Sequence, residues 1–283
     1  MASVLLLSGC AWMPFSKPQV SEEEELLHRL LYASPDRSPD SSRQHGNRSQ
    51  TDRQLTLAPS RSTRLAPPML TLAGAQRCLQ SGGIPKETFQ EAHPTNYDRR
   101  EKRDAEGQLV EHVPMMIVLH ETVASEEDTL NFFRTPHPDE SDQASYHMLI
   151  PEDGRRVRIV SDADRAFGAG NSAFSNYTIR LKPNTPGSIN NVALHLSFVS
   201  PPDGRGEAPT HSGYTERQYR SAAAQVLLWQ AAYAIPLDRL TTHKSVDQSQ
   251  SRTDPRSFEW KIFLSAHSQL AAACGLQAYA SIR

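Results

Sequence analysis

A run of apolar residues from Met115 to Leu119 ends abruptly in a histidine, an acid and a hydroxyl at His120, Glu121 and Thr122. Its length and composition are typical of a buried β-strand that presents polar side chains at its end. Because a strand alternates its faces, His120 and Thr122 point to one side and Glu121 points to the other. We expect the rest of the chain to be organised around this strand.

Three downstream segments have the composition and length of strands. Residues 145–150 and 156–160 flank the tight turn at residues 151–154, Pro-Glu-Asp-Gly, and this pattern predicts a β-hairpin. Residues 192–198 are the most strand-like segment of the second half. Residues 241–244, Thr-Thr-His-Lys, are predicted to form a polar loop.

Helix signals alternate irregularly with these strands. Ser125 starts a capping box before a short helix, and Thr215 caps a long helix that ends at Pro236. Residues 258–270 have the pattern of a final amphipathic helix. We therefore predict an α/β fold in which a mixed central β-sheet is flanked by helices.

The composition divides the 283 residues into a leader and one folded domain. Residues 11–68 are rich in Ser, Pro, Arg, Asp and Gln. Such a segment buries too little apolar surface to offset the entropy of ordering it, so we expect a flexible tether. The apolar segments crowd into residues 69–283, which we predict to be a single domain with its core at residues 96–270.

Residues 1–10 form a short apolar run that closes on Leu7-Ser8-Gly9-Cys10. This ending resembles the lipobox of bacterial lipoproteins, which implies acylation of Cys10 and export to the periplasm or another part of the cell envelope. The run lacks the basic residues that begin an export signal, so either the true start lies upstream or the run is not a signal. We expect an exported, lipid-anchored protein.

Charge and cysteine content limit the partners. The formal net charge is −2 and the basic residues are scattered, which gives no electrostatic reason to expect nucleic acid. No segment approaches the length of a membrane span, so we expect membrane contact only through the lipid anchor, and a monomer. Cys78 and Cys274 could pair in an oxidising compartment, but we expect two buried free thiols.

Two later residues make His120 a candidate metal ligand. His243 lies after the long helix, and Asp254 lies in the segment Thr-Asp-Pro. A hydrolytic zinc site commonly uses three histidine or carboxylate ligands and leaves a fourth position for water. His120, His243 and Asp254 satisfy that count from three separated segments.

The order of these motifs resembles the zinc-dependent N-acetylmuramoyl-L-alanine amidases of the type 2 family, which share a fold with T7-type lysozyme and peptidoglycan recognition proteins. The resemblance runs from about Asn96 to Leu270. Its motifs are the apolar strand ending in His120-Glu121-Thr122, then Ser145-Tyr146-His147 before the hairpin, Gly168-Ala169-Gly170-Asn171, Thr242-His243, and Thr253-Asp254-Pro255.

The resemblance implies a role for several side chains. It implies that His120, His243 and Asp254 bind Zn²⁺, and that Tyr146 assists the reacting carbonyl. His147, the next residue, is expected to face the other side of the sheet and to be structural.

Two departures from the family pattern leave the general base open. Many members carry a glutamate in the strand that matches residues 191–199, whereas this chain has no acid there and places His195 at the matching position. Members often show Trp-His where this chain has Phe167-Gly168. A histidine can accept and return a proton near neutral pH, so His195 is either a catalytic base or a buried structural residue. Glu121 is expected to point away from the metal.

Three further residues are candidates for contacts with substrate. Arg252 either binds a substrate carboxylate or oxyanion or is a solvated charge, and Phe167 and Asn171 lie in a loop expected at the rim of the cleft. The predicted reaction is zinc-dependent hydrolysis of the amide between N-acetylmuramic acid and L-alanine in peptidoglycan. The alternatives are an inactive peptidoglycan-binding protein of the same fold, and a hydrolase acting on soluble muropeptides or another amide.

Overall fold

The computed structural model describes residues 71–206 and 208–280. The predicted lipidation site Cys10 and the predicted tether at residues 11–68 lie outside them. Among the helices in the described ranges, none combines the length and the apolar composition needed to cross a bilayer.

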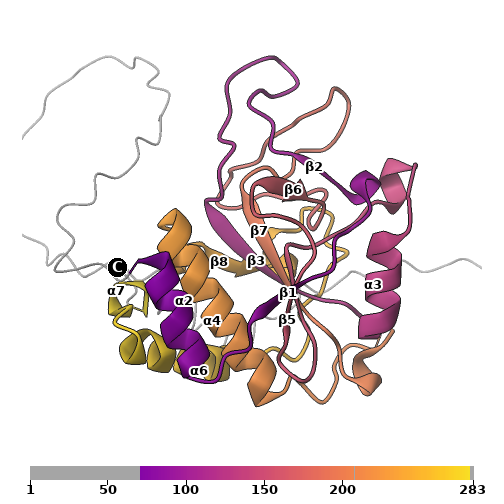
Figure 1. Cartoon of the computed structure of the whole chain (residues 1–283). Coiled ribbons are helices and arrows are strands. Elements are labelled where there is room, and N and C mark those ends of the chain that lie inside the picture. The colour runs from indigo at the N-terminus through magenta and orange to yellow at the C-terminus, as the bar shows by residue number, and fades with distance from the viewer. Residues whose placement is uncertain (1–70, 207, 281–283) are drawn as a thin grey trace, which may run out of the picture. The chain divides into compact units, whose positions relative to one another are not determined.

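A six-stranded sheet with the strand order β1-β5-β4-β7-β3-β8 forms the centre of the fold (Figure 1). The strand β3 pairs in parallel with β7 on one side and with β8 on the other, whereas β4 and β5 form the predicted antiparallel hairpin. The predicted mixed sheet is confirmed. Its strands are β1 (Glu87–Phe89), β3 (Met116–Glu121), β4 (Met148–Ile150), β5 (Arg156–Arg158), β7 (Ala193–Phe198) and β8 (Leu240–Thr242).

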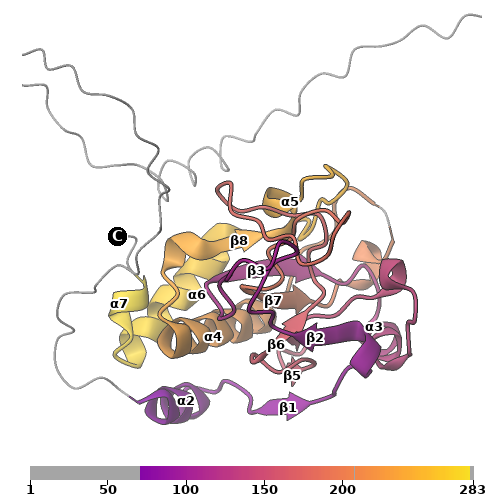
Figure 2. The ribbon, with the colours of Figure 1, turned by 90° about the horizontal axis from the view of Figure 1, so that it is seen from above.

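A small second sheet and several helices surround the centre (Figure 2). The strands β2 (Tyr97–Arg99) and β6 (Asp164–Ala166) pair antiparallel. The helices are α2 (Leu72–Ser81), α3 (Glu126–Arg134), α4 (Glu216–Tyr233), the short α5 (His243–Val246), α6 (Trp260–Ala273) and α7 (Gln277–Ala280), with 3₁₀ turns at Pro94–Asn96, Glu140–Asp142, Pro202–Gly204 and Leu237–Arg239.

The predicted helix starts are confirmed by their capping contacts. The Ser125 hydroxyl accepts a hydrogen bond from the backbone N–H of Asp128 and begins α3. Thr215 and Gln218 form a capping box at the start of α4. That helix ends at Ala234, whose left-handed backbone turns the chain before Pro236. Local side-chain chemistry therefore sets these ends.

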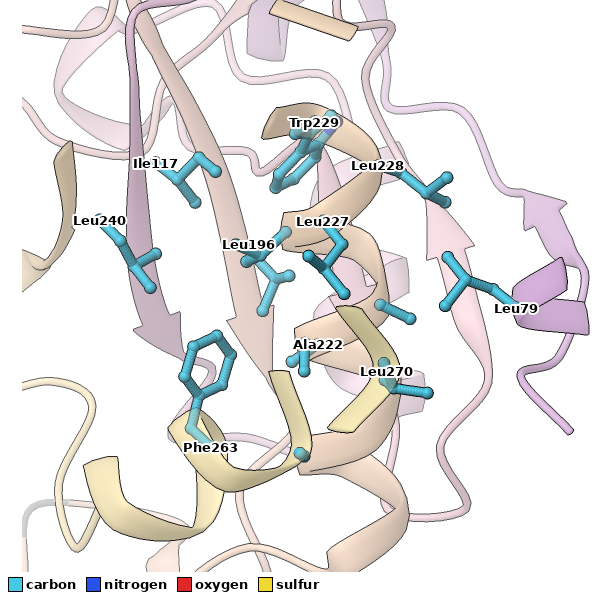
Figure 3. Packing of buried hydrophobic residues seen from close by; sticks show 14 of the residues in the cluster. Leu79, Ile117, Leu196, Ala222, Leu227, Leu228, Trp229, Leu240, Phe263 and Leu270 are labelled. Atoms are coloured by element: carbon cyan, nitrogen blue, oxygen red, sulfur yellow. The ribbon is translucent and has the colours of Figure 1, made fainter. Parts of the chain in front are cut away.

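One face of the sheet carries the larger hydrophobic core (Figure 3). Leu119 of β3 and Leu196 of β7 are fully buried against α4 and α6, together with Phe263 of α6. Burying a side chain of this size stabilises the fold by about 1.5–3 kcal/mol relative to leaving it exposed. The helix layer on this face thus fixes the position of β3.

The opposite face of β3 carries smaller side chains and the histidines. Val118 and Ala193 pack with Ile189 and Val246 in a separate cluster. His120 lies on this face because it is two residues beyond Val118. This second face, which is covered by loops, therefore carries His120.

The predicted polar loop at residues 241–244 is wrong. Leu240–Thr242 forms β8 at the edge of the sheet, and His243 begins α5. The Thr242 side chain caps α5 by accepting a hydrogen bond from the backbone N–H of Ser245. Thr241 and Thr242 are β-branched residues that suit a half-buried edge strand despite their polarity.

The prediction of two free thiols is also wrong, because Cys78 and Cys274 form a disulfide. Cys78 lies in α2, and Cys274 follows the last residue of α6. The hydrophobic core brings these ends together because Leu79 of α2 and Leu270 of α6 are buried in the same cluster. The bridge therefore links α2 to the end of α6 through two cysteines that are 196 positions apart in the sequence.

Removing this bridge should destabilise the domain. The double substitution Cys78→Ala with Cys274→Ala is expected to lower the free energy of unfolding by about 2–4 kcal/mol, because the unfolded chain gains conformational freedom. Urea denaturation measures the loss. The parent protein treated with a thiol reductant is the control and should match the variant; equal stability of the oxidised parent and the variant would contradict the prediction.

Candidate metal centre and active site

Two parallel strands bring His120 and His243 together. Leu119 of β3 is paired with Thr242 of β8, so the residues that follow each of them, His120 and His243, lie at the same edge of the sheet. Asp254 comes from the segment after α5, where its carbonyl oxygen accepts a hydrogen bond from the backbone N–H of Lys244 at 3.0 Å. The three predicted metal ligands therefore meet at the carboxyl ends of β3 and β8.

The ligand atoms of these three residues all lie within 4.8 Å of one another. His120 Nδ1 is 3.3 Å from Asp254 Oδ2, and His243 Nδ1 is 3.0 Å from Asp254 Oδ1. Burial lowers the pKa of His120 to about 4. Although burial alone would raise the pKa of Asp254, the adjacent imidazoles of His120 and His243 hold that pKa well below the usual range. The group thus combines neutral imidazole with ionised carboxylate.

This donor set fits a divalent metal such as zinc. His120 Nδ1 is buried and makes no hydrogen bond within the described structure, although the carboxylate oxygen Oδ2 of Asp254 lies beside it. Its other ring nitrogen, Nε2, is 2.9 Å from His195 Nδ1. If Nε2 carries the ring proton, Nδ1 presents a lone pair toward Asp254, and two lone pairs facing each other attract a cation.

Tyr146 lies directly against the ligand group. Its ring centroid is 4.7 Å from that of His120 and 5.5 Å from that of Phe133, which packs edge-on against it. Burial, together with the negative charge of Asp254, raises the pKa of Tyr146 well above its ordinary value. The phenol therefore keeps its proton at neutral pH and can act as a hydrogen-bond donor.

Two further histidines near the ligand group are fully buried. His195 is fully buried on the His120 face, where Val118 is its neighbour in β3. Burial lowers the pKa of His195 well below 6.5, and the histidines around it lower it further. His147 is also fully buried, with its Nδ1 accepting the backbone N–H of His195 at 3.0 Å.

Glu121 lies on the opposite face of β3 from His120 and has structural partners. Its carboxylate forms an ion pair with Arg256 and accepts hydrogen bonds from Tyr214 at 3.1 Å and Ser200 at 3.2 Å. His211 Nε2 is 3.0 Å from the same carboxylate. The strand alternation predicted this direction, and the contacts explain how a fully buried carboxylate is tolerated.

The ion pair of Glu121 with Arg256 links the segments that carry two of the candidate ligands, His120 and Asp254. Glu121 follows His120, and Arg256 lies two residues after Asp254. Arg256 also donates hydrogen bonds to the carbonyl oxygens of Gly204 and Gly206. The pair therefore ties β3, the Asp254 segment and the 204–206 loop together beneath the site.

The remaining predicted site residues lie at the edges of this group. Arg252 is exposed, and its backbone N–H donates to the Asp247 carboxylate at 2.9 Å. Phe167 is half-buried, with the guanidinium of Arg165 5.3 Å from its ring centroid. Asn171 is exposed, and its carbonyl oxygen accepts the backbone N–H of Gln248. Their proposed contacts with substrate stay predictions.

Two residues of functional interest were missed by the sequence reasoning. Arg256 is one of many basic residues, and its pairing with Glu121 spans 135 positions. Gly168 packs against the ring of His195 so closely that a Cβ atom there would lie 2.5 Å from His195 Nδ1. No local sequence pattern signals the second contact, because it joins two separate segments of the chain.

The Glu121–Arg256 pair gives a stability prediction. Glu121→Gln should lower the free energy of unfolding by about 3–5 kcal/mol, because it leaves the buried Arg256 charge without its partner. The matched control is Glu126→Gln, which removes one of the two acidic partners of the half-exposed Arg155 and should cost about 0–1 kcal/mol. Urea denaturation measures the free energy of unfolding of both variants. Equal losses in the two variants would contradict the prediction that the buried Glu121–Arg256 pair contributes more to stability.

Three solved structures are similar over much of the chain, each with a low TM-score. The selenomethionine derivative of AmpD has 19% identity, covers 65% of this chain and 94% of that chain, and gives a TM-score of 0.45. AmiD from E. coli, in complex with anhydro-N-acetylmuramic acid-L-Ala-D-gamma-Glu-L-Lys, has 18% identity, coverage of 64% and 66%, and a TM-score of 0.44.

The third structure is AMPDH3 from Pseudomonas aeruginosa in complex with an anhydromuramic pentapeptide. It has 20% identity, covers 55% of this chain and 60% of that chain, and gives a TM-score of 0.43. No curated protein sequence matches the chain. The sequence profile of the N-acetylmuramoyl-L-alanine amidase family matches residues 111–257, which is more than half of the chain and includes His120, His243 and Asp254. The chain therefore belongs to the N-acetylmuramoyl-L-alanine amidase family.

Proposed function

We propose that this member of the family hydrolyses, with zinc, the amide between the lactyl group of N-acetylmuramic acid and L-alanine in peptidoglycan. The observation that carries the proposal is the convergence of His120, His243 and Asp254 within 4.8 Å at one edge of the sheet. When bound there, zinc would polarise the scissile carbonyl and make water a usable nucleophile near neutral pH. The family match and the donor set both support this chemistry.

The chain supplies groups suited to the other tasks of the reaction. Tyr146, beside His120 and protonated at neutral pH, is placed to donate a hydrogen bond to the oxygen that gains negative charge. Arg252 is close enough to Asp254 in the chain to bring a positive charge to the rim of the site, where it would attract a substrate carboxylate. Phe167 would offer an apolar surface to the substrate.

The substrate class is supported by two of the related structures. AmiD and AMPDH3 were solved with anhydromuramic acid peptides bound. We propose a muropeptide or peptidoglycan substrate for this chain, and no nucleic acid. Comparing activity on intact sacculi with activity on soluble anhydro-muropeptides would distinguish wall remodelling from the recycling of fragments.

The amidase activity is tested with purified protein and defined muropeptides. Zinc-loaded protein should release the stem peptide, detected by mass spectrometry, and Asp254→Ala should reduce both stoichiometric zinc and turnover to background, because the carboxylate ligand is lost. The matched control is Asp139→Ala, which removes an exposed carboxylate outside the ligand group. Full zinc occupancy in Asp254→Ala would overturn the ligand assignment.

The alternative function is a peptidoglycan-binding protein without catalysis. The observation that favours it is that β7, the strand expected to match the one in which many family members carry glutamate, has no acidic residue, and that its histidine, His195, is fully buried. Persistent binding to sacculi, with zinc bound and no stem peptide released, would support this alternative and exclude the amidase.

We also propose that the protein is exported and anchored through Cys10. The Cys78–Cys274 disulfide supports export because such bonds persist in oxidising compartments. When the chain is produced in a bacterial host, Cys10→Ser should move it from the membrane fraction to the soluble fraction, because the acylated residue is lost. The control Cys78→Ala keeps Cys10 and should stay in the membrane fraction; unchanged partitioning of Cys10→Ser would exclude the anchor.

A further inference from the structure

His195 contacts a metal-ligand side chain rather than the solvent. Its side chain is fully buried in β7, and its Nδ1 atom is 2.9 Å from Nε2 of His120. A ligand atom must be unprotonated, so a metal on Nδ1 of His120 requires the proton on Nε2. That proton can only be donated, and His195 Nδ1 is the atom that accepts it.

The ring of His195 is held in place by its neighbour in β4. His147 Nδ1 accepts the backbone N–H of His195 at 3.0 Å. Its Nε2 atom is 3.2 Å from both the carbonyl oxygen of Asp164 and the guanidinium of Arg100. The two imidazole rings are stacked, with centroids 5.7 Å apart and an interplanar angle of 16°. His147 therefore supports one side of the His195 ring.

Gly168 also lies against the ring of His195. A Cβ atom at this position would lie 2.5 Å from Cγ and Nδ1 of His195, a distance that real Cβ atoms do not adopt. Any larger residue at position 168 would have to displace the ring, including the nitrogen that faces His120. The histidine at 195 thus requires the glycine at 168.

We infer that His195 is a positioning residue that fixes the tautomer and orientation of His120. We also infer that Gly168, which has no side chain, leaves the room that the His195 ring needs. Proton transfer is not the role of His195, because its Nδ1 is occupied by His120 and its Nε2 is buried away from solvent. This inference rests on the proposed metal site but not on amidase turnover.

The first test measures zinc affinity by competition with a chromophoric chelator. His195→Ala should weaken zinc binding about 10–100-fold, as loss of a group that orients a metal ligand generally does. His195→Asn should restore most of the affinity, because an amide oxygen can stand where Nδ1 stood and accept the same hydrogen bond. Unchanged affinity in His195→Ala, with turnover abolished, would overturn the inference in favour of a proton-transfer role.

The second test is a double-mutant cycle on the same readout. Gly168→Ala should weaken zinc binding in the parent but have little effect in the His195→Ala background, where no ring is displaced. Gly170→Ala is the matched control because a Cβ atom there meets nothing within 4 Å. Equal effects of Gly168→Ala in both backgrounds would show that the two residues are not coupled.

A spectroscopic readout covers the case in which His195→Ala folds poorly. In the zinc-loaded parent, the His120 Nε2 proton should give a hydrogen-bonded, slowly exchanging ¹⁵N–¹H signal that Gly168→Ala shifts or removes and Gly170→Ala leaves unchanged. Absence of that signal in the folded, zinc-loaded parent would contradict the hydrogen bond. If the zinc and NMR results are as expected but the protein shows no amidase activity, only the proposed function is contradicted.

Discussion

The parallel pairing of β3 with both β7 and β8 is the constraint on which the site depends. Parallel strands end at the same edge of a sheet, which is where sites in open α/β sheets form. The pairing of Leu119 with Thr242 places His120 beside His243, and the pairing of Val118 with His195 places a second imidazole behind the first. The helices that bury the other face hold this register, because a shift of one residue would exchange the two faces of β3.

Local signals in the sequence predicted the parts of the fold that depend on nearby residues. The strand at His120, the β4–β5 hairpin and the starts of α3 and α4 each follow from a pattern a few residues long. The strand β8 was missed because three residues, two of them threonines, carry almost no periodicity. The disulfide was missed because Cys78 and Cys274 meet only after α2 and α6 have joined one core.

In the candidate site, too, some features could be predicted from the sequence and others could not. The order of motifs predicted that His120, His243 and Asp254 would meet, and strand alternation predicted that Glu121 would turn away from them. The partner of Glu121 could not be predicted, because Arg256 pairs with it across 135 positions and through a loop with no regular structure. The contact of Gly168 with His195 was equally hidden, since it depends on how a loop crosses the sheet.

The disulfide determines what happens to this domain when one of its peptide bonds is cut. It joins Cα atoms 5.8 Å apart, one in α2 and the other directly after the last residue of α6. Hydrolysis of any single peptide bond between Cys78 and Cys274, a stretch that contains the whole sheet and all three candidate ligands, leaves the two pieces covalently attached. A protease that nicks a surface loop would therefore produce a two-chain molecule rather than two separate fragments.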